Sequence, residues 1–260
     1  MPFHQPDSIR YYTFESLDEA DVIHGIFTRR GGVSPQPWAS LNVGGLRGDD
    51  PARVLENRVR SFHTVGRVPE SVYDVWQVHS TDVVCTDAPR PPHPHVKADA
   101  ILTNRPEVTL FMRFGDCVPI LLYDPVRKVV GLAHAGWLGT VKATSRETID
   151  RMHAVYGSLP ADIVAAIGPS IAAHHYKVGA DVLQQVNQAF GSEADTLLDE
   201  HDGSVHFDLW AANRQLLERA GVRRIEIAGI CSACHLEDWY SHRGEAGQTG
   251  RFGALIALKG

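Results

Sequence analysis

Two continuous apolar runs joined by a turn constrain the fold of this chain more than any other feature. Residues 118–123 (VPILLY) and 129–135 (VVGLAHA) have the length and composition of strands. The DPVRK between them begins with Asp-Pro, a pair that initiates turns. We therefore expect a buried β-hairpin. Its ends carry Cys117 and His134, metal-capable residues that an apolar core does not need.

The remaining pattern mixes strands and helices. Strands are expected at residues 22–28, 72–78, 100–103, 109–114, 163–168, 225–230 and 254–258. Helices are expected at 140–156, where Gly157 supplies a stop, at 180–190, and at 209–220, where Asp208 supplies a cap. The sequence shows neither an internal repeat nor a linker. We expect residues 1–260 to form a single α+β domain with mixed β-sheets flanked by helices, in a layered α/β/β/α sandwich.

Charge and hydropathy exclude several classes of protein. The 31 acidic residues outnumber the 25 Lys and Arg, which argues against binding to nucleic acid. No apolar stretch is long enough to span a membrane, and the N-terminal segment lacks the apolar core of a signal peptide. We expect a cytoplasmic protein with no membrane partner. The four cysteines are then expected to be reduced thiols or metal ligands rather than disulfides.

His79, Cys117 and His134 form the strongest candidate site. Each lies at an expected strand end, and they are too far apart in sequence for a local zinc motif, so the fold would have to assemble them. Two imidazoles and one thiolate suit zinc, and three protein ligands leave a fourth position for water or substrate. The alternative is that Cys117 is a small core residue and the histidines are hydrogen-bonded strand ends.

Two segments are candidates for binding an anion. HAGWLGT (134–140) joins a strand to a helix through two glycines, which leaves backbone N–H groups available. FTRRGGVSPQPWASLNVG (27–44) offers Arg29 and Arg30, followed by Ser40 and Asn42, as a phosphate or sugar clamp. The alternatives are a tight turn with an ordinary helix cap and a solvated irregular loop.

Other motifs predict no site. CSACH (231–235) matches the haem-attachment pattern of exported proteins, and a lone C-x-x-C lacks the second ligand pair of a structural zinc site. The histidines of HPH (93–95) and the His174–His175 pair are expected to be exposed without metal. The chain contains no zinc-deaminase signature, P-loop, dinucleotide-binding glycine motif or nucleophile elbow.

The order of motifs resembles one known family. TRRGGVS, ASLNVG, GDDP, ENR, QVHS, ADAILTN, GDCVPILLYDP, LAHAGWLGT, AAIGPSI and FDLWAANRQLL follow one another from about residue 23 to the C-terminus. This order is similar to that of the laccase-domain proteins, long labelled multicopper polyphenol oxidases and also described as purine nucleoside phosphorylases. The resemblance implies a zinc ion, less readily copper, held by His79, Cys117 and His134.

The resemblance also implies an activity. Family members use phosphate to cleave adenosine, inosine, guanosine or methylthioadenosine to the base and a ribose 1-phosphate, and adenosine deamination is ascribed to them. Purine nucleoside and phosphate would then be the partners, with Arg29, Ser40, Asn42 and Gln77 contacting substrate. Asp116, next to a metal ligand, or Asp99 would carry a proton.

The chain departs from the family pattern at several positions. Leu138 replaces the arginine of HAGWRG, and Ser170, His175 and Lys177 stand at the usual Cys, Cys and Glu positions. GDC replaces ADC, and WYSHRG (239–244) replaces FFSYRR. The zinc ligands are intact, whereas the chemistry of the substrate pocket is altered.

Two other functions remain open at this stage. Cys117 could be the nucleophile of a thiol hydrolase or deamidase, with His134 as its base. A metal-binding accessory protein without turnover is the other, suggested by Leu138 and Ser170. A copper oxidase is disfavoured because the sequence lacks clustered histidine ligands. The preferred nucleoside and the oligomeric state are not set by the sequence.

Overall fold

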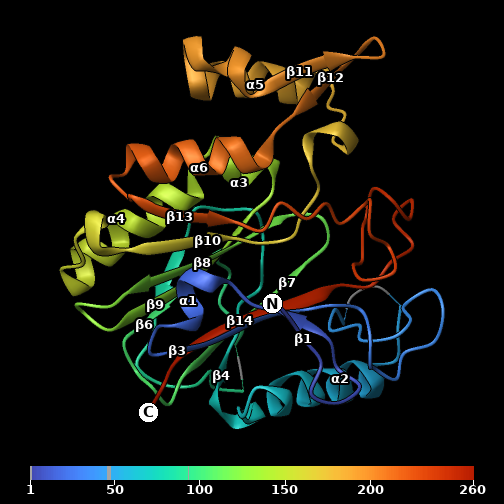
Figure 1. Cartoon of the computed structure of the whole chain (residues 1–260), viewed down its shortest axis with the longest axis vertical. Helices are drawn as coiled ribbons and strands as arrows, with labels where there is room; N and C mark the ends of the chain where they lie inside the picture. Colours follow the sequence, from blue (N-terminus) through green and yellow to red (C-terminus); the bar gives the residue numbers. More distant parts are fainter. Residues whose placement is uncertain (1, 46–47, 93) are drawn as a thin grey trace.

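The computed structural model describes residues 2–45, 48–92 and 94–260. Within these ranges, two six-stranded sheets pack face to face, and helices cover the outer face of each (Figure 1). Both sheets are mixed, because parallel and antiparallel neighbours occur in each. The expected α+β class with mixed sheets flanked by helices is confirmed, in the order helix, sheet, sheet, helix.

The first sheet contains the predicted hairpin. Its strand order is β13 (Arg224–Ile227), β10 (Val164–Ile167), β8 (Val118–Asp124), β9 (Val129–Ala135), β6 (Ala100–Thr103) and β5 (Val83–Cys85). Every residue of β8 and β9 is buried, as their unbroken apolar runs predict. The Asp124 side chain closes the turn by accepting hydrogen bonds from the N–H groups of Val126 and Arg127.

The second sheet has the order β1 (Phe3–His4), β2 (Tyr11–Tyr12), β3 (Val22–Phe27), β14 (Phe252–Leu258), β7 (Thr109–Phe114) and β4 (Val72–Tyr73). Its inner side chains, such as Met112 and Ile256, share a core with Leu121 and Val130 of the first sheet. This shared core joins the two sheets, because neither could bury its inner face alone.

Helices α3 (Trp137–Val141), α4 (Thr144–Tyr156) and α6 (Leu209–Arg219) lie on the outer side of the first sheet (Figure 1). Asp208 caps α6 as predicted, accepting from the N–H groups of Trp210 and Ala211. The predicted single helix at 140–156 is wrong. Ala143 adopts a left-handed conformation (φ 62°) that separates α3 from α4 and brings Thr144 Oγ1 to 3.0 Å from the Ser80 carbonyl oxygen.

Helix α2 (Pro51–Thr64) covers the outer side of the second sheet and is absent from the sequence-based prediction. Its start is encoded locally, because the Asp50 side chain accepts from Ala52 N–H and Pro51 occupies the first turn. Phe62 of this helix packs edge-on against Phe111 of the sheet, with ring centroids 5.0 Å apart.

The predicted strand at 72–78 is also too long. β4 ends at Tyr73, and the next side chain, Asp74, forms ion pairs with several arginines. Trp76 then forms an isolated β-bridge with Lys97 instead of continuing the strand. Other predicted strands agree to within one to three residues with β3, β10, β13 and β14, and the helix at 180–190 agrees with α5 (Ala180–Phe190). The unpredicted elements are short: the strands β1, β2, β5, β11 (Leu198–His201) and β12 (Ser204–Phe207), the helix α1 (Glu15–Asp18) and the 3-10 turns Pro69–Ser71, Pro160–Asp162, Ala173–His175 and Gly191–Thr196.

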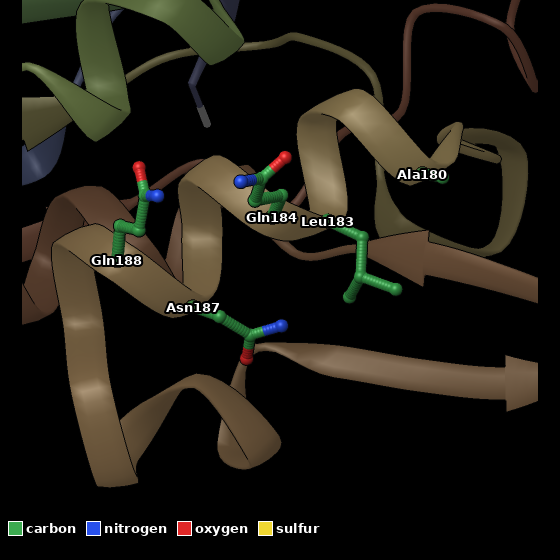
Figure 2. Close-up of a pocket in the computed structure, with 5 residues that line it drawn as sticks. All are labelled: Ala180, Leu183, Gln184, Asn187 and Gln188. Carbon is green, nitrogen blue, oxygen red and sulfur yellow. The ribbon is translucent and has the colours of Figure 1, made fainter.

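Helix α5 and the β11–β12 hairpin lie at one end of the molecule, beyond α6 (Figure 1). A hollow on α5 is lined by Ala180, Leu183, Gln184, Asn187 and Gln188 of that helix (Figure 2). It brings together no charged or nucleophilic side chain, so it does not resemble a reaction site. None of the helices in the described ranges is both long and apolar enough to cross a membrane.

Candidate active site

A cavity of about 900 Å³ lies where the ends of β7, β8 and β9 meet the C-terminal loops. Metal-capable side chains, arginines and aromatic rings all contribute to its wall. The lining residues include Arg58, Trp76, Gln77, His79, His95, Arg113, Phe114, Asp116, Cys117, His134, Trp137, Tyr176, Arg243 and Arg251. A cavity of this size accommodates a small organic ligand together with an anion.

The hairpin itself brings Cys117 and His134 together. Val118 pairs with Ala135 and Pro119 with His134 at the open end of the β8–β9 ladder. Cys117, one residue before β8, therefore lies beside His134 near the end of β9. Their ligand atoms and that of His79 all lie within 4.8 Å of one another, with His79 Nε2 3.9 Å from Cys117 Sγ. The predicted trio is thus brought together.

Asp99 organises the two histidines of the trio. It is buried just before β6, where its Oδ2 accepts hydrogen bonds from the backbone N–H groups of Val78 (3.0 Å) and Ser80 (2.7 Å). These bonds hold His79 between them in a left-handed conformation (φ 61°). Its other oxygen, Oδ1, lies 2.8 Å from His134 Nδ1. One carboxylate therefore fixes the loop of one histidine and the ring of the other.

The Asp99 contact determines which nitrogen of His134 is available. A carboxylate favours a proton on Nδ1, which leaves Nε2 directed away from Asp99 to act as a ligand or base. Burial opposes the charge on Asp99, yet the hydrogen bonds from His134, Ser80 and Val78 together lower its pKa to about 2. Asp99 is thus an ionised anchor at neutral pH.

Cys117 and His134 form a charged pair when no metal is bound. Burial opposes the charge on each, but the positive His134 ring, with a hydrogen bond from His79, lowers the pKa of the Cys117 thiol to about 6. Burial likewise opposes the charge on His134, but the Cys117 thiolate and Asp99 raise its pKa to about 9. A thiolate at neutral pH is the form of cysteine that binds metals and attacks electrophiles.

The trio fits a divalent metal ion. A thiolate and two imidazoles are borderline-soft donors suited to zinc, and a carboxylate behind one histidine is the usual outer support of such a ligand. Gly136 leaves the necessary space, because a Cβ at that position would lie 2.7 Å from Cys117 Sγ and 3.3 Å from His79 Cδ2. The donors border the cavity, which leaves room for a non-protein ligand.

Positive charge gathers at one side of the cavity. Asp74 lies within 4 Å of Arg58, Arg90 and Arg113, so these cations outnumber the carboxylate that they share. Burial and the nearby Arg113 charge lower the pKa of Arg58 to about 10, despite the attraction of Asp74. Arg58 and Arg113 line the cavity, and their excess charge favours binding of an anion.

The predicted substrate contacts do not all reach this cavity. Arg29 is buried, donates to Ala39 O, Leu236 O and Glu245 Oε1, and lies 4.4 Å from the Tyr240 ring centre. Ser40 donates its hydroxyl to the Arg29 carbonyl oxygen. Asn42 binds Asp49 and the N–H groups of Gly44 and Arg251. These three side chains stabilise the loop wall rather than line the cavity.

Gln77 and Asp116 do line the cavity. The Gln77 amide makes a two-way contact with the backbone of Arg113, at 2.8 Å and 3.1 Å, and also accepts from the Arg113 side chain. Asp116 accepts from Ser232 Oγ and from Arg243 N–H, each at 2.7 Å. Both are therefore held in fixed positions at the site.

Sequence reasoning missed the arginines and rings of the cavity wall. Arg58 is carried on α2, and its helix could have been found from the Asp-Pro start at residues 50–51. Arg243 lies 5.2 Å over the Tyr176 ring centre and donates to Lys177 O. No local pattern brings these residues together, because they come from separate segments.

The fold brings the CSACH cysteines next to the His174–His175 pair, an arrangement that the sequence did not predict, while both histidines are exposed as expected. The fold places His174, His175, Cys231 and Cys234 with their ligand atoms within 4.8 Å of one another. The histidines supply the second pair that the C-x-x-C lacks in sequence. His93 of the HPH motif lies outside the described residues, and His95 contacts Asp74 at 3.1 Å.

Three of the departures from the family pattern are not among the described residues that line the cavity. Leu138 follows Trp137 in the short helix after His134. Ser170 is buried and accepts a hydrogen bond from Trp210 Nε1 at 2.6 Å, so the hydroxyl has a structural partner. Lys177 is exposed, and its backbone pairs with His206.

Known proteins resemble this chain over nearly its full length. A family model described as multi-copper polyphenol oxidoreductase laccase matches residues 23–259. A protein of Deinococcus radiodurans named purine nucleoside phosphorylase is 42% identical over 91% of this chain and 89% of its own. The purine nucleoside phosphorylase YlmD of Bacillus subtilis is 36% identical over 92% of this chain and 89% of its own.

Solved structures share the fold. The crystal structure of YlmD from Geobacillus stearothermophilus has a TM-score of 0.90 at 30% identity, covering 100% of this chain and 99% of that one. A structure titled Bacillus licheniformis hypothetical protein YfiH has a TM-score of 0.89 at 31% identity, covering 99% of each chain. The chain therefore belongs to the multi-copper polyphenol oxidoreductase laccase family.

Proposed function

We propose that this protein is a purine nucleoside phosphorylase that transfers the ribosyl group of a purine nucleoside to phosphate. The bond between the sugar and the base breaks while a phosphate oxygen bonds to the anomeric carbon, which yields the free base and ribose 1-phosphate. One observation carries the proposal: a metal-donor trio, an arginine cluster and several aromatic rings line the same cavity. The names of the relatives support it.

Aromatic side chains suit the purine. Trp76, Phe114, Trp137 and Tyr176 all line the cavity, and flat heterocycles stack favourably on such rings. Trp76 is 43% exposed, so its ring is accessible to a ligand in the cavity. We assign the base to this aromatic part of the wall.

Phosphate suits the arginine side of the cavity. Arg58 and Arg113 are oriented by Asp74, and Arg113 is further held by Gln77. An oriented guanidinium binds phosphate oxygens without losing much side-chain freedom, which favours a fixed angle of attack on the sugar. Arg58 replaces Arg29 as our candidate phosphate contact, because Arg29 is engaged inside the protein.

Zinc is the metal that we assign to His79, Cys117 and His134. When bound, it would supply Lewis-acid chemistry at the cavity. Asp99 orients His134 and holds the His79 loop, and Asp116, which lines the cavity, is our candidate to carry a proton. The same arrangement is suited to adenosine deamination, in which water replaces the amino group of the base and ammonia leaves.

Chromatographic detection of free base tests the proposal. Adenosine and inosine are incubated with zinc-loaded protein, with and without phosphate, beside Cys117→Ser and the matched control Cys85→Ser. We expect phosphate-dependent release of base that Cys117→Ser abolishes and Cys85→Ser retains. Adenosine converted to inosine would report deamination. No base from the native, metal-loaded protein would overturn the assignment for these substrates.

Arg58→Gln tests the phosphate site separately. We expect the KM for phosphate to rise at least tenfold with unchanged metal content, since charge-assisted contacts contribute about 1.5–3 kcal/mol each. Arg60→Gln is the matched control, because Arg60 lies on the same helix and pairs with the exposed Glu56. An unchanged KM for phosphate in Arg58→Gln would remove Arg58 from the site.

A thiol hydrolase or deamidase is the second candidate function. Asp99, His134 and Cys117 follow one another as anchor, base and nucleophile, with 2.8 Å between Asp99 Oδ1 and His134 Nδ1. This reading predicts inactivation by thiol alkylation and full activity in the presence of a metal chelator. The phosphorylase proposal predicts loss of activity with the chelator and recovery with zinc. A protein that binds metal but turns over none of these substrates would support the metal-binding accessory function instead.

A further inference from the structure

We propose that His174, His175, Cys231 and Cys234 bind a second zinc ion in a closed site with four protein ligands. Their ligand atoms lie within 4.8 Å of one another, on the loops that follow β10 and β13. Two imidazoles with two thiolates are a common donor set of structural zinc sites. The His79–Cys117–His134 trio, in contrast, supplies three protein donors and opens into the cavity.

The distances within the cluster match those of a tetrahedral zinc ion. Bond lengths of 2.3 Å to sulfur and about 2.05 Å to nitrogen require a separation of about 3.6 Å between sulfur and nitrogen. His175 Nδ1 lies 3.5 Å from both Cys231 Sγ and Cys234 Sγ, and His174 Nε2 lies 3.1 Å from Cys234 Sγ. These three separations lie within about 0.5 Å of the tetrahedral value, and the remaining pairs of ligand atoms lie within 4.8 Å.

The fold brings the two ligand pairs together through backbone contacts. Ser170 N–H donates to Ile230 O, and Ser232 N–H donates to Ser170 O, so the two loops run side by side. The 3-10 turn Ala173–His175 then presents both histidines toward the turn that carries the cysteines. Cys231 Sγ also accepts from Ala172 N–H at 3.4 Å, a backbone contact that holds the sulfur beside the histidine turn.

The second site adjoins the wall of the cavity. Ser232, between the two cysteines, donates to Asp116, the neighbour of Cys117. Tyr176, directly after His175, lines the cavity under the Arg243 guanidinium. A metal at the second site would therefore cross-link the two loops that hold Asp116 and Tyr176. We assign it a structural role, because the described side chains supply four donors and leave no open position.

Metal counting tests the second site without any assay of activity. Full-length protein is loaded with Zn²⁺, desalted, and its zinc content per chain measured by mass spectrometry. We expect two zinc ions in the native protein and one in Cys234→Ser, His174→Asn and Cys117→Ser. The double variant Cys117→Ser/Cys234→Ser should retain none. One ion in the native protein, unchanged in Cys234→Ser, would overturn the proposal.

Matched controls separate metal loss from general damage. His235→Asn changes the exposed histidine next to Cys234, which contacts Glu237 rather than the cluster, and Cys85→Ser removes a cysteine outside both groups. Both should retain two zinc ions. Far-UV circular dichroism checks that Cys234→Ser and His174→Asn are folded. If one of them is unfolded, the zinc content of the other still tests the second site.

Cobalt substitution identifies the ligands directly. Co²⁺ in the second site has two thiolates, so Cys117→Ser should keep a strong sulfur-to-metal charge-transfer absorption, and the double variant Cys117→Ser/Cys234→Ser should lose it. Thiol titration of the denatured native protein addresses the competing state, a Cys231–Cys234 disulfide. We expect four free thiols. Two free thiols in freshly prepared protein with one zinc ion would replace the metal site with a redox pair.

Discussion

Replacing Asp99 by asparagine gives the sharpest test of how the trio is built. Asp99 Oδ2 accepts from Val78 and Ser80 N–H, and an asparagine oxygen can keep both bonds. The amide nitrogen must then occupy the position of Oδ1, 2.8 Å from His134 Nδ1. Two donors cannot share a hydrogen bond, so His134 is driven to carry its proton on Nε2, the nitrogen needed as a ligand.

The magnitude follows from the role of this contact. Removing a carboxylate that supports a metal-binding histidine weakens metal affinity by about 10- to 100-fold, equal to about 1.4–2.7 kcal/mol. We expect Asp99→Asn to lose zinc affinity within this range while the fold is retained. Zinc competition with a chromophoric chelator measures the affinity, and circular dichroism measures the fold.

Asp82→Asn is the control for the Asp99 experiment. Asp82 is exposed, and its backbone carbonyl oxygen, rather than its carboxylate, accepts a hydrogen bond from Asp99 N–H. Its zinc affinity should match that of the native protein. Unchanged affinity in Asp99→Asn would refute the reasoning, since His134 would then be an adequate ligand without the carboxylate.

Three further predictions concern separate parts of the molecule. Gly136→Ala should lower zinc occupancy, measured by mass spectrometry, because the new Cβ would lie 2.7 Å from Cys117 Sγ; full occupancy would contradict this. Burial lowers the pKa of His24 to about 4, so the unfolded chain takes up a proton first as the pH falls below 6.5. The free energy of unfolding should therefore be greatest above pH 6.5 and should fall by about 2 kcal/mol between pH 7 and pH 5. Urea unfolding at pH 7 and pH 5 should show this loss in the native protein and a smaller loss in His24→Gln. An equal loss in His24→Gln would show that His24 is not its source. Asp208→Ala should lower the free energy of unfolding by about 1 kcal/mol, because two N–H groups of α6 lose their cap, and no change in denaturation midpoint would argue against it.

The sequence predicted those features that local patterns encode. Strands β8 and β9 could be found from their unbroken apolar runs, and the α6 cap from Asp208. The break at Ala143 could not be found, because an alanine in a left-handed conformation is imposed by tertiary contacts such as that of Thr144 with Ser80.

The candidate site shows the same division. His79, Cys117 and His134 were found from strand ends and family resemblance, and the structure brings them together. Asp99 fixes two of them through contacts with His134 and Ser80, which are distant from it in sequence, so no local motif predicts this role. His174 and His175 join the C-x-x-C pair across about 60 residues of chain, so their distance in sequence hid the cluster.

Phosphorus NMR of the reaction with inosine tests the central claim most directly. Native zinc-loaded protein is mixed with inosine and inorganic phosphate, and the phosphorus signal is followed while hypoxanthine is measured by absorbance. We predict that the inorganic phosphate signal converts to that of ribose 1-phosphate, in step with the base released. Release of base with an unchanged phosphate signal would identify water as the acceptor and contradict the phosphorylase account.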